Sequence, residues 1–149
     1  MSTYTEKVSS KLNDLLEKTY DAEKGFKKAA ENVKNEALKN YFSKKAQERY
    51  DFGHELKSEI KSFGQEVDKG GSALGSAHRA WMDVKNVLSM DNEESMLEEA
   101  IRGEKSALDE YQDVLNESNL PPSTESILLK QKNQIQSGLN TIQRLEDLN

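Results

Sequence analysis

Two glutamates occupy positions where a helical pattern calls for apolar side chains. Glu104 lies in the segment AIRGEKSALDEY at 100–111, and the other residues on its helix face are apolar: Ala100, Ile101, Ala107, Leu108 and Tyr111. Glu23, in AEKGF at 22–26, has similar surroundings. A carboxylate buried in a helical core must be paired with a cation, protonated or bound to a metal. The chemistry of this protein therefore depends on what these two carboxylates contact.

One chemistry that joins such glutamates is a carboxylate-bridged di-metal centre. In helical bundles that hold two metal ions, two helices each contribute one Glu and the other two each contribute Glu-x-x-His. Here the last helical segment contains no histidine, and the second offers only Asp51 and His54 at that spacing. Because His54 points away from the apolar face of its helix, we expect no bound metal. The alternative is an iron or manganese site that uses Glu23 and Glu104, with Glu48 or Asp51, and with His54 turned inward.

An arginine fills the place of the missing ligands. Arg49 lies on the apolar face of the second helical segment, at a depth similar to that of Glu23. One guanidinium group has five donors in a fixed fork and can satisfy two carboxylates, while a glutamine amide adds further hydrogen bonds. We therefore predict a structural polar layer of Glu23, Arg49, Glu104 and Gln131, which sets the register of the helices. Three glycines would allow close helix approach around this layer: Gly25, Gly53 and Gly103.

Four long amphipathic segments must position these side chains. Apolar residues recur at helical spacing over 8–33, 38–63, about 93–116, and from Ser123 or Thr124 to 145. The first two segments, and the last two, are joined by short turns that force antiparallel neighbours, whereas the middle connection is long. This order predicts an all-α fold in one domain over residues 1–149. It is an up-down four-helix bundle with one long crossover, the ferritin-like topology.

The crossover carries a second group of polar candidates. It begins with the glycine-rich stretch QEVDKGGSALGS at 65–76 and continues with a short amphipathic helix at 77–88, which has His78 and Trp81 on one face. We expect Trp81 to plug the bundle and His78 to be hydrogen-bonded at the core boundary rather than catalytic. The sequence offers no nucleophile, base and orienting group that could act together here.

The composition narrows the range of partners and compartments. The chain has a net charge of −6, and its basic residues are spread out, so we expect no nucleic-acid ligand. No apolar run approaches the roughly 18–20 residues that span a bilayer, and we expect no membrane partner. The absence of cysteine excludes disulfides, thiolate metal sites and cysteine catalysis, and favours a cytoplasmic protein. The sequence leaves open whether the chain forms a homo-oligomer, because long bundle faces commonly pair. It identifies no small-molecule ligand.

Four stretches of the chain are distinctive: LNDLLEKTYDAEKGFKKAAE, GSALGSAHRAWMDVK, RGEKSALDEYQDVL, and LPPS before a glutamine-containing last helix. Together they resemble a bacterial family of ferritin-like four-helix-bundle proteins of unknown function, over about Leu12 to Leu145. The resemblance implies a ferritin-like fold and no established activity, and it carries over six matching residues: Glu23, Arg49, His78, Trp81, Arg102 and Glu104. Family members often have a histidine near the position of Leu139, and its replacement here further weakens a metal site.

These observations predict a non-enzymatic, metal-free bundle that acts as a structural or interaction protein. A stress-related role is what the wider superfamily suggests. The alternative function is a di-iron or di-manganese carboxylate oxidase or a peroxide-handling enzyme.

Overall fold

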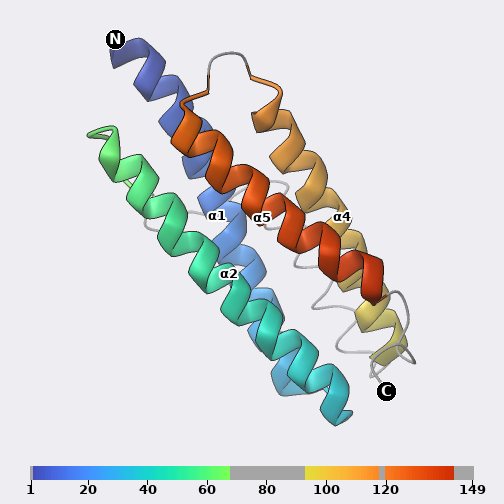
Figure 1. Cartoon of the computed structure of the whole chain (residues 1–149). Coiled ribbons are helices and arrows are strands. Elements are labelled where there is room, and N and C mark those ends of the chain that lie inside the picture. Colours follow the sequence, from blue (N-terminus) through green and yellow to red (C-terminus); the bar gives the residue numbers. More distant parts are fainter. Residues whose placement is uncertain (1, 68–92, 118–119, 143–149) are drawn as a thin grey trace.

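The computed structural model describes residues 2–67, 93–117 and 120–142, and these residues form four helices. The helices are α1 (Ser2–Asn32), α2 (Glu36–Ser62), α4 (Glu93–Leu115) and α5 (Pro122–Thr141), shown in Figure 1. Among these residues there is no strand, so the predicted all-α class is confirmed for the part of the chain that is described.

The first hairpin turns where the sequence predicts. Residues 33–35 separate α1 from α2, and the side chain of Asn35 caps α2 by accepting a 3.0 Å hydrogen bond from the backbone N–H of Leu38. At the other end, α2 stops at Ser62 and Gly64 follows with a φ of +74°. That left-handed conformation is open to glycine without strain, which explains the stop signal at this position.

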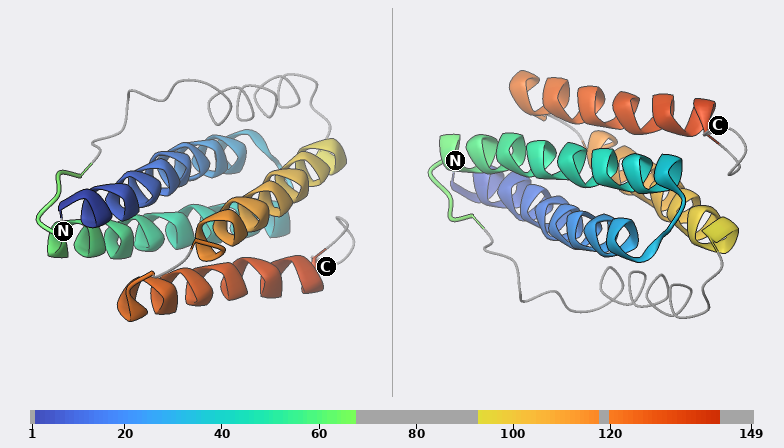
Figure 2. Two further views of the ribbon diagram at one scale, coloured as in Figure 1. Left: turned by 90° about the horizontal axis from the view of Figure 1, so that it is seen from above. Right: turned by 90° about the horizontal axis from the view of Figure 1, so that it is seen from below.

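The two hairpins are placed so that α2 and α4 run in the same direction (Figures 1 and 2). The carboxylate of Glu93, the first residue of α4, accepts hydrogen bonds from the backbone N–H groups of Lys34 (2.6 Å) and Asn35 (3.0 Å). The start of α4 therefore lies against the start of α2. The end of α2 thus lies at the opposite end of the helices from the start of α4 (Figure 1).

The start of α5 differs from the sequence prediction. The helix begins at Pro122, and its N-cap residue makes no side-chain cap bond, whereas we expected Ser123 or Thr124 to open the helix. A proline suits the first helical position because no hydrogen bond is required of its nitrogen there. The two hydroxyls instead donate to one oxygen of Glu59 on α2, each at 2.6 Å. A carboxylate from the first hairpin thus lies at the positive end of a helix in the second.

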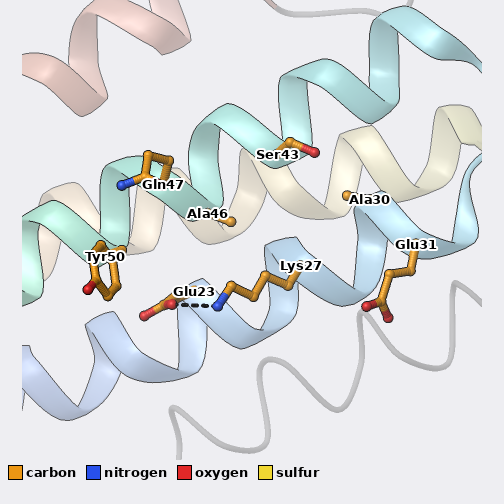
Figure 3. A pocket seen from close by; sticks show the side chains of 8 residues that line it. All are labelled: Glu23, Lys27, Ala30, Glu31, Ser43, Ala46, Gln47 and Tyr50. Carbon is orange, nitrogen blue, oxygen red and sulfur yellow. Dashed lines mark ion pairs between the residues drawn. The ribbon is translucent and has the colours of Figure 1, made fainter.

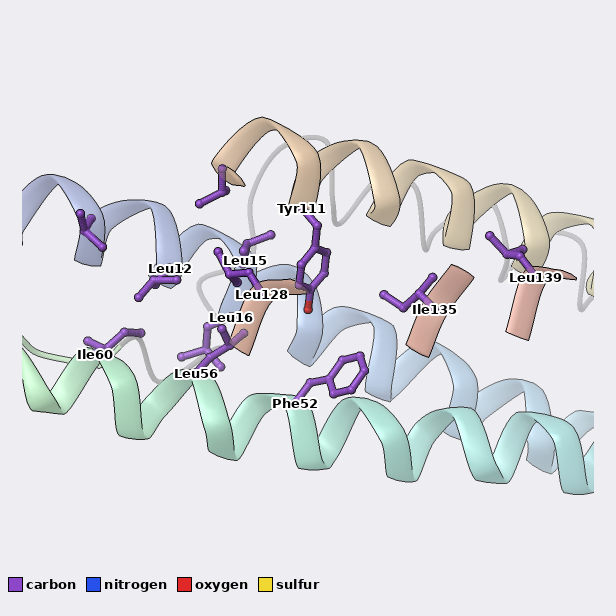
Figure 4. Packing of buried hydrophobic residues seen from close by; sticks show 12 residues of the cluster. Leu12, Leu15, Leu16, Phe52, Leu56, Ile60, Tyr111, Leu128, Ile135 and Leu139 are labelled. Atoms are coloured by element: carbon purple, nitrogen blue, oxygen red, sulfur yellow. The ribbon is translucent and has the colours of Figure 1, made fainter. Parts of the chain in front are cut away.

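The apolar interior falls into two clusters along the helices. The first, near the N-terminus of α1, is built from all four helices and is shown in Figure 4; its buried residues are Val8, Leu12, Leu15, Leu16, Phe52, Leu56, Ile60, Tyr111, Val114, Leu128, Ile135 and Leu139. The second lies toward the other end; its buried residues are Ala22, Phe26, Ala29, Ala30, Val33, Leu38, Tyr41, Phe42, Ala46, Met96, Leu97 and Ala100. Buried Arg49 lies between Ala46 of the second cluster and Phe52 of the first, so a polar group interrupts the core where they meet.

One expectation concerns a part of the chain beyond this description. The short crossover helix, with His78 and Trp81, lies outside the described residues. Within the described residues, no helix combines the length and the apolar character needed to cross a membrane.

Candidate functional site

The centre of the site is an ion pair between Arg49 of α2 and Glu104 of α4. Arg49 is 3% exposed and Glu104 is 1% exposed. The contact is bidentate, since Nη2 donates to Oε1 and Nη1 donates to Oε2 at 3.4 Å. The guanidinium carbon also lies 5.6 Å from the ring centres of both Phe26 and Phe52. A planar cation between aromatic groups, with a forked carboxylate partner, suits the chemistry of arginine better than that of lysine.

Two further side chains of α2 complete a four-member ion cluster. Lys45 Nζ lies 3.3 Å from Glu104 Oε2 and 3.5 Å from Glu48 Oε1, and Arg49 Nη1 donates to the same Glu48 oxygen at 2.8 Å. We call Lys45, Glu48, Arg49 and Glu104 the core ion cluster. It contains two cations and two carboxylates, so its formal charge is zero. Neutrality matters here because an unbalanced charge at this depth would be strongly destabilising.

The surroundings of Arg49 and of two nearby tyrosines, Tyr41 and Tyr111, shift their pKa values. Burial by itself lowers the pKa of Arg49, but the nearby charges of Glu104 and Glu48 and the hydrogen bond to Glu104 outweigh it, and the pKa is raised. Burial raises the pKa of Tyr111 well above its ordinary value, while the charge of Arg49 acts in the opposite direction. Burial likewise raises the pKa of Tyr41, and Glu104 adds to this shift. The arginine therefore stays charged and the two phenols stay neutral at physiological pH.

Gln131 of α5 lies in the core but has different partners from those expected. It is fully buried, and its carbonyl accepts a 2.6 Å hydrogen bond from the hydroxyl of Tyr111 on α4. Its amide donates to the carbonyl of Phe52 at 3.3 Å and to Glu55 Oε1 at 3.0 Å, both on α2. We predicted that the side-chain amide of Gln131 would donate hydrogen bonds to the carboxylates of the polar layer. These hydrogen bonds instead go to a neighbouring turn of α2. Gln131 joins three helices next to the core ion cluster.

The structure does not bring Glu23 into the core ion cluster. The Glu23 carboxylate pairs with Lys27 at 2.9 Å, one turn along α1, and its side chain is 16% exposed. Both line a pocket of about 430 Å³ between α1 and α2 (Figure 3), with Tyr50 at one side. Glu23 lies at the edge of the apolar face of α1, from which a long side chain reaches the surface. Lys45 and Glu48, which sequence reasoning did not place in the layer, take part instead.

The described residues do not fit a di-metal centre. His54, the histidine of the alternative metal site, is exposed and packs edge-on against Tyr50, with ring centres 4.6 Å apart. Asp51 is also exposed and accepts a hydrogen bond from Gln47. No group of three or more histidine, aspartate or glutamate side chains within the described ranges is arranged to hold a metal. The two carboxylates of the core ion cluster already meet protein cations, and no imidazole from the described part of the chain joins them.

The predicted role of Gly53 in close helix packing is wrong. A methyl group at Gly53 would lie 3.8 Å from Leu16 and 3.9 Å from Thr19, which are ordinary contact distances. Gly138 of α5, by contrast, leaves space beside the cluster. A methyl group there would lie 2.7 Å from Lys45 Nζ.

Fold and site together define an all-α protein whose described helices enclose a neutral ion cluster. The family model "Domain of unknown function (DUF2383)" matches residues 7–117, which cover α2, α4 and all but the first few residues of α1. The chain therefore belongs to this family of unknown function. No curated protein matches the chain.

Proposed function

We propose that this chain is a non-enzymatic, metal-free protein with a ferritin-like bundle, and that it acts as a structural or interaction protein. One observation carries the proposal: the two core carboxylates, Glu48 and Glu104, are neutralised by two cations of the same chain, Lys45 and Arg49. Metal-binding bundles of this shape use ions at the corresponding depth to join carboxylates from different helices. Here protein side chains perform that joining.

The role that suits such a cluster is to specify how the helices pair. Replacing a buried ion pair by apolar groups is often neutral or stabilising, so the pair does little for stability as such. Separating the partners is strongly unfavourable, because each charge would be left buried alone. Arg49 and Glu104 lie on different hairpins, so a slipped or inverted docking of the hairpins separates them. The cluster therefore selects one register.

The ferritin-like assignment is supported by the direction of the helices. α2 and α4 run the same way (Figure 2), and a long stretch of sequence separates them, as a bundle with one crossover requires. A cytoplasmic location and a stress-related role are parts of the same proposal. They rest on the absence of cysteine and on the resemblance of the sequence to the superfamily.

Elemental analysis tests the proposal directly. The protein is produced with iron and manganese in the medium and purified without chelators. We expect less than about one-tenth of an equivalent of either metal per chain. Metal near one or two equivalents, lost in Glu104→Gln, would overturn the proposal and support a di-iron or di-manganese carboxylate oxidase or peroxide-handling protein. Size-exclusion chromatography of the same sample tests whether the chain forms a homo-oligomer.

A further inference from the structure

The ammonium group of Lys45 lies in a position that resembles a binding site for a small cation. Two carboxylate oxygens face it, at 3.3 Å on Glu104 and 3.5 Å on Glu48, and the ring centre of Tyr41 lies 5.9 Å away. The side chain is 10% exposed. Carboxylates and an aromatic face are the groups that proteins use to bind ammonium ions.

Gly138 of α5 lies next to the ammonium group of Lys45. It lies inside α5, where a helix interior ordinarily disfavours glycine relative to alanine. A methyl group on Gly138 would stand 2.7 Å from Nζ and 3.6 Å from Cε of Lys45. A contact of 2.7 Å is too short for carbon and nitrogen, so any side chain here pushes the ammonium group away. Space around the ammonium group, rather than backbone conformation, favours glycine here, and because Nζ is the end of a flexible side chain it is the atom that would shift.

We propose that Lys45 is a tethered ligand in a site for one monovalent, ammonium-type cation, and that Gly138 admits it. This inference rests on the proposed function, in which protein cations fill the core. The charge count sets the class of ligand. Without Lys45, the cluster retains Arg49 against Glu48 and Glu104, a net charge of −1, which a single monovalent cation neutralises. A divalent ion would leave an excess positive charge in the core.

Chemical rescue tests the site. Lys45→Ala removes the three outer methylenes and the ammonium group, which together correspond to n-propylammonium. We expect n-propylammonium chloride to raise the melting temperature of K45A by about 3 °C over sodium chloride at equal ionic strength. The parent protein, K45A/E104Q and the matched control Lys44→Ala should show no such difference; Lys44 is the exposed lysine next to it on α2. An equal response of K45A and K44A would overturn the proposal, and so would stabilisation of K45A by manganese chloride but not by the amine.

Chemical labelling of the folded protein tests the role of Gly138 without removing Lys45. Lysines are acetylated with a limiting reagent and the modification of Lys45 is followed by mass spectrometry. We expect Lys45 to react at least tenfold more slowly than Lys44 in the parent and in Gly53→Ala, and to become reactive in Gly138→Ala. Equal reactivity of Lys45 and Lys44 in the parent, or equal protection of Lys45 in G138A and G53A, would refute the inference. The proposed function fails separately, by stoichiometric metal in the parent protein.

Discussion

Glu104→Gln removes the charge at the centre of the core ion cluster and keeps the size of the side chain. In the parent, the Glu104 carboxylate meets Arg49 through both oxygens and meets Lys45 at 3.3 Å. In the variant, two cations face only Glu48, so the buried cluster has a net charge of +1. The amide can accept one hydrogen bond from Arg49, but its NH₂ group faces donors.

The expected loss of stability follows from this geometry. Removing one partner of a buried ion pair costs about 3–5 kcal/mol, because the other charge stays buried and uncompensated. Arg49 is 3% exposed and is held between two aromatic rings, so it cannot easily turn toward water. Glu48 retains its contact with Arg49, and its side chain is 18% exposed. We therefore expect Glu104→Gln to lower the free energy of unfolding by about 3 kcal/mol. This is a large part of the total free energy of unfolding of a domain, which is typically about 5–15 kcal/mol.

Urea unfolding followed by far-ultraviolet circular dichroism measures this loss. The matched control is Glu23→Gln, the same substitution in a pair whose lysine is 62% exposed, and its midpoint should hardly change. A second comparison uses the single variants Arg49→Met and Glu104→Met and the double variant that combines them. The double variant leaves Lys45 and Glu48 paired, and we expect it to lie within about 1 kcal/mol of the parent although each single variant is much less stable.

Equal shifts of the unfolding midpoint in E104Q and E23Q would contradict an uncompensated buried charge in E104Q. Additive effects of the two methionine substitutions would contradict the pairing, since Arg49 and Glu104 would then not depend on each other.

Three further predictions concern other contacts. Glu59→Gln should lower the free energy of unfolding by about 1 kcal/mol, since a carboxylate at the start of α5 is lost; thermal unfolding measures it, and no change would contradict the capping role. Gly53→Ala should stabilise the protein by roughly 0.5–1 kcal/mol, because alanine has the higher helix propensity. Gly138→Ala should not show this gain, because the new methyl group displaces the ammonium group of Lys45. Urea unfolding of the two variants measures the difference. Tyr41 and Tyr111 should not form phenolate in the native protein when the pH passes about 10, the ordinary value for tyrosine. Because their pKa values are raised by folding, the unfolded state releases these protons first and stability falls as the pH rises above about 10. Ultraviolet absorbance should therefore report their ionisation together with unfolding, and ionisation of both in the folded protein would contradict the shifts.

Sequence periodicity predicted which residues lie inside for a large part of the molecule. Arg49 and Glu104 were identified as core residues because they occupy apolar positions of their helices, and both are buried. The end of α2 before Gly64 was also predictable, since a glycine at that position is a local signal. The position of Glu23 could not be predicted from periodicity. Glu23 lies at the edge of the apolar face of α1, where the sequence pattern alone does not decide between the core and the surface.

Lys45 could not be identified in the same way. A lysine beside Ala46 on a polar helix ordinarily extends into solvent. Its burial depends on the space left by Gly138, which is far along the chain on a different helix. The pairing of Glu59 with Ser123 and Thr124 is similar, because it joins residues 64 and 65 positions apart. The only signal was the 3- and 4-residue spacing of Lys45, Glu48 and Arg49 along α2, which is common on solvated faces as well.

The sequence by itself determined the helices, their hairpin order and the presence of charges inside the core. Those properties depend on local spacing, capping and chain length, which a linear pattern records. The tertiary structure alone decided which charges meet. Partner choice depends on how each helix is rotated about its axis and on how closely its neighbours approach, and a change of a few ångströms there separates a bidentate ion pair from two isolated charges.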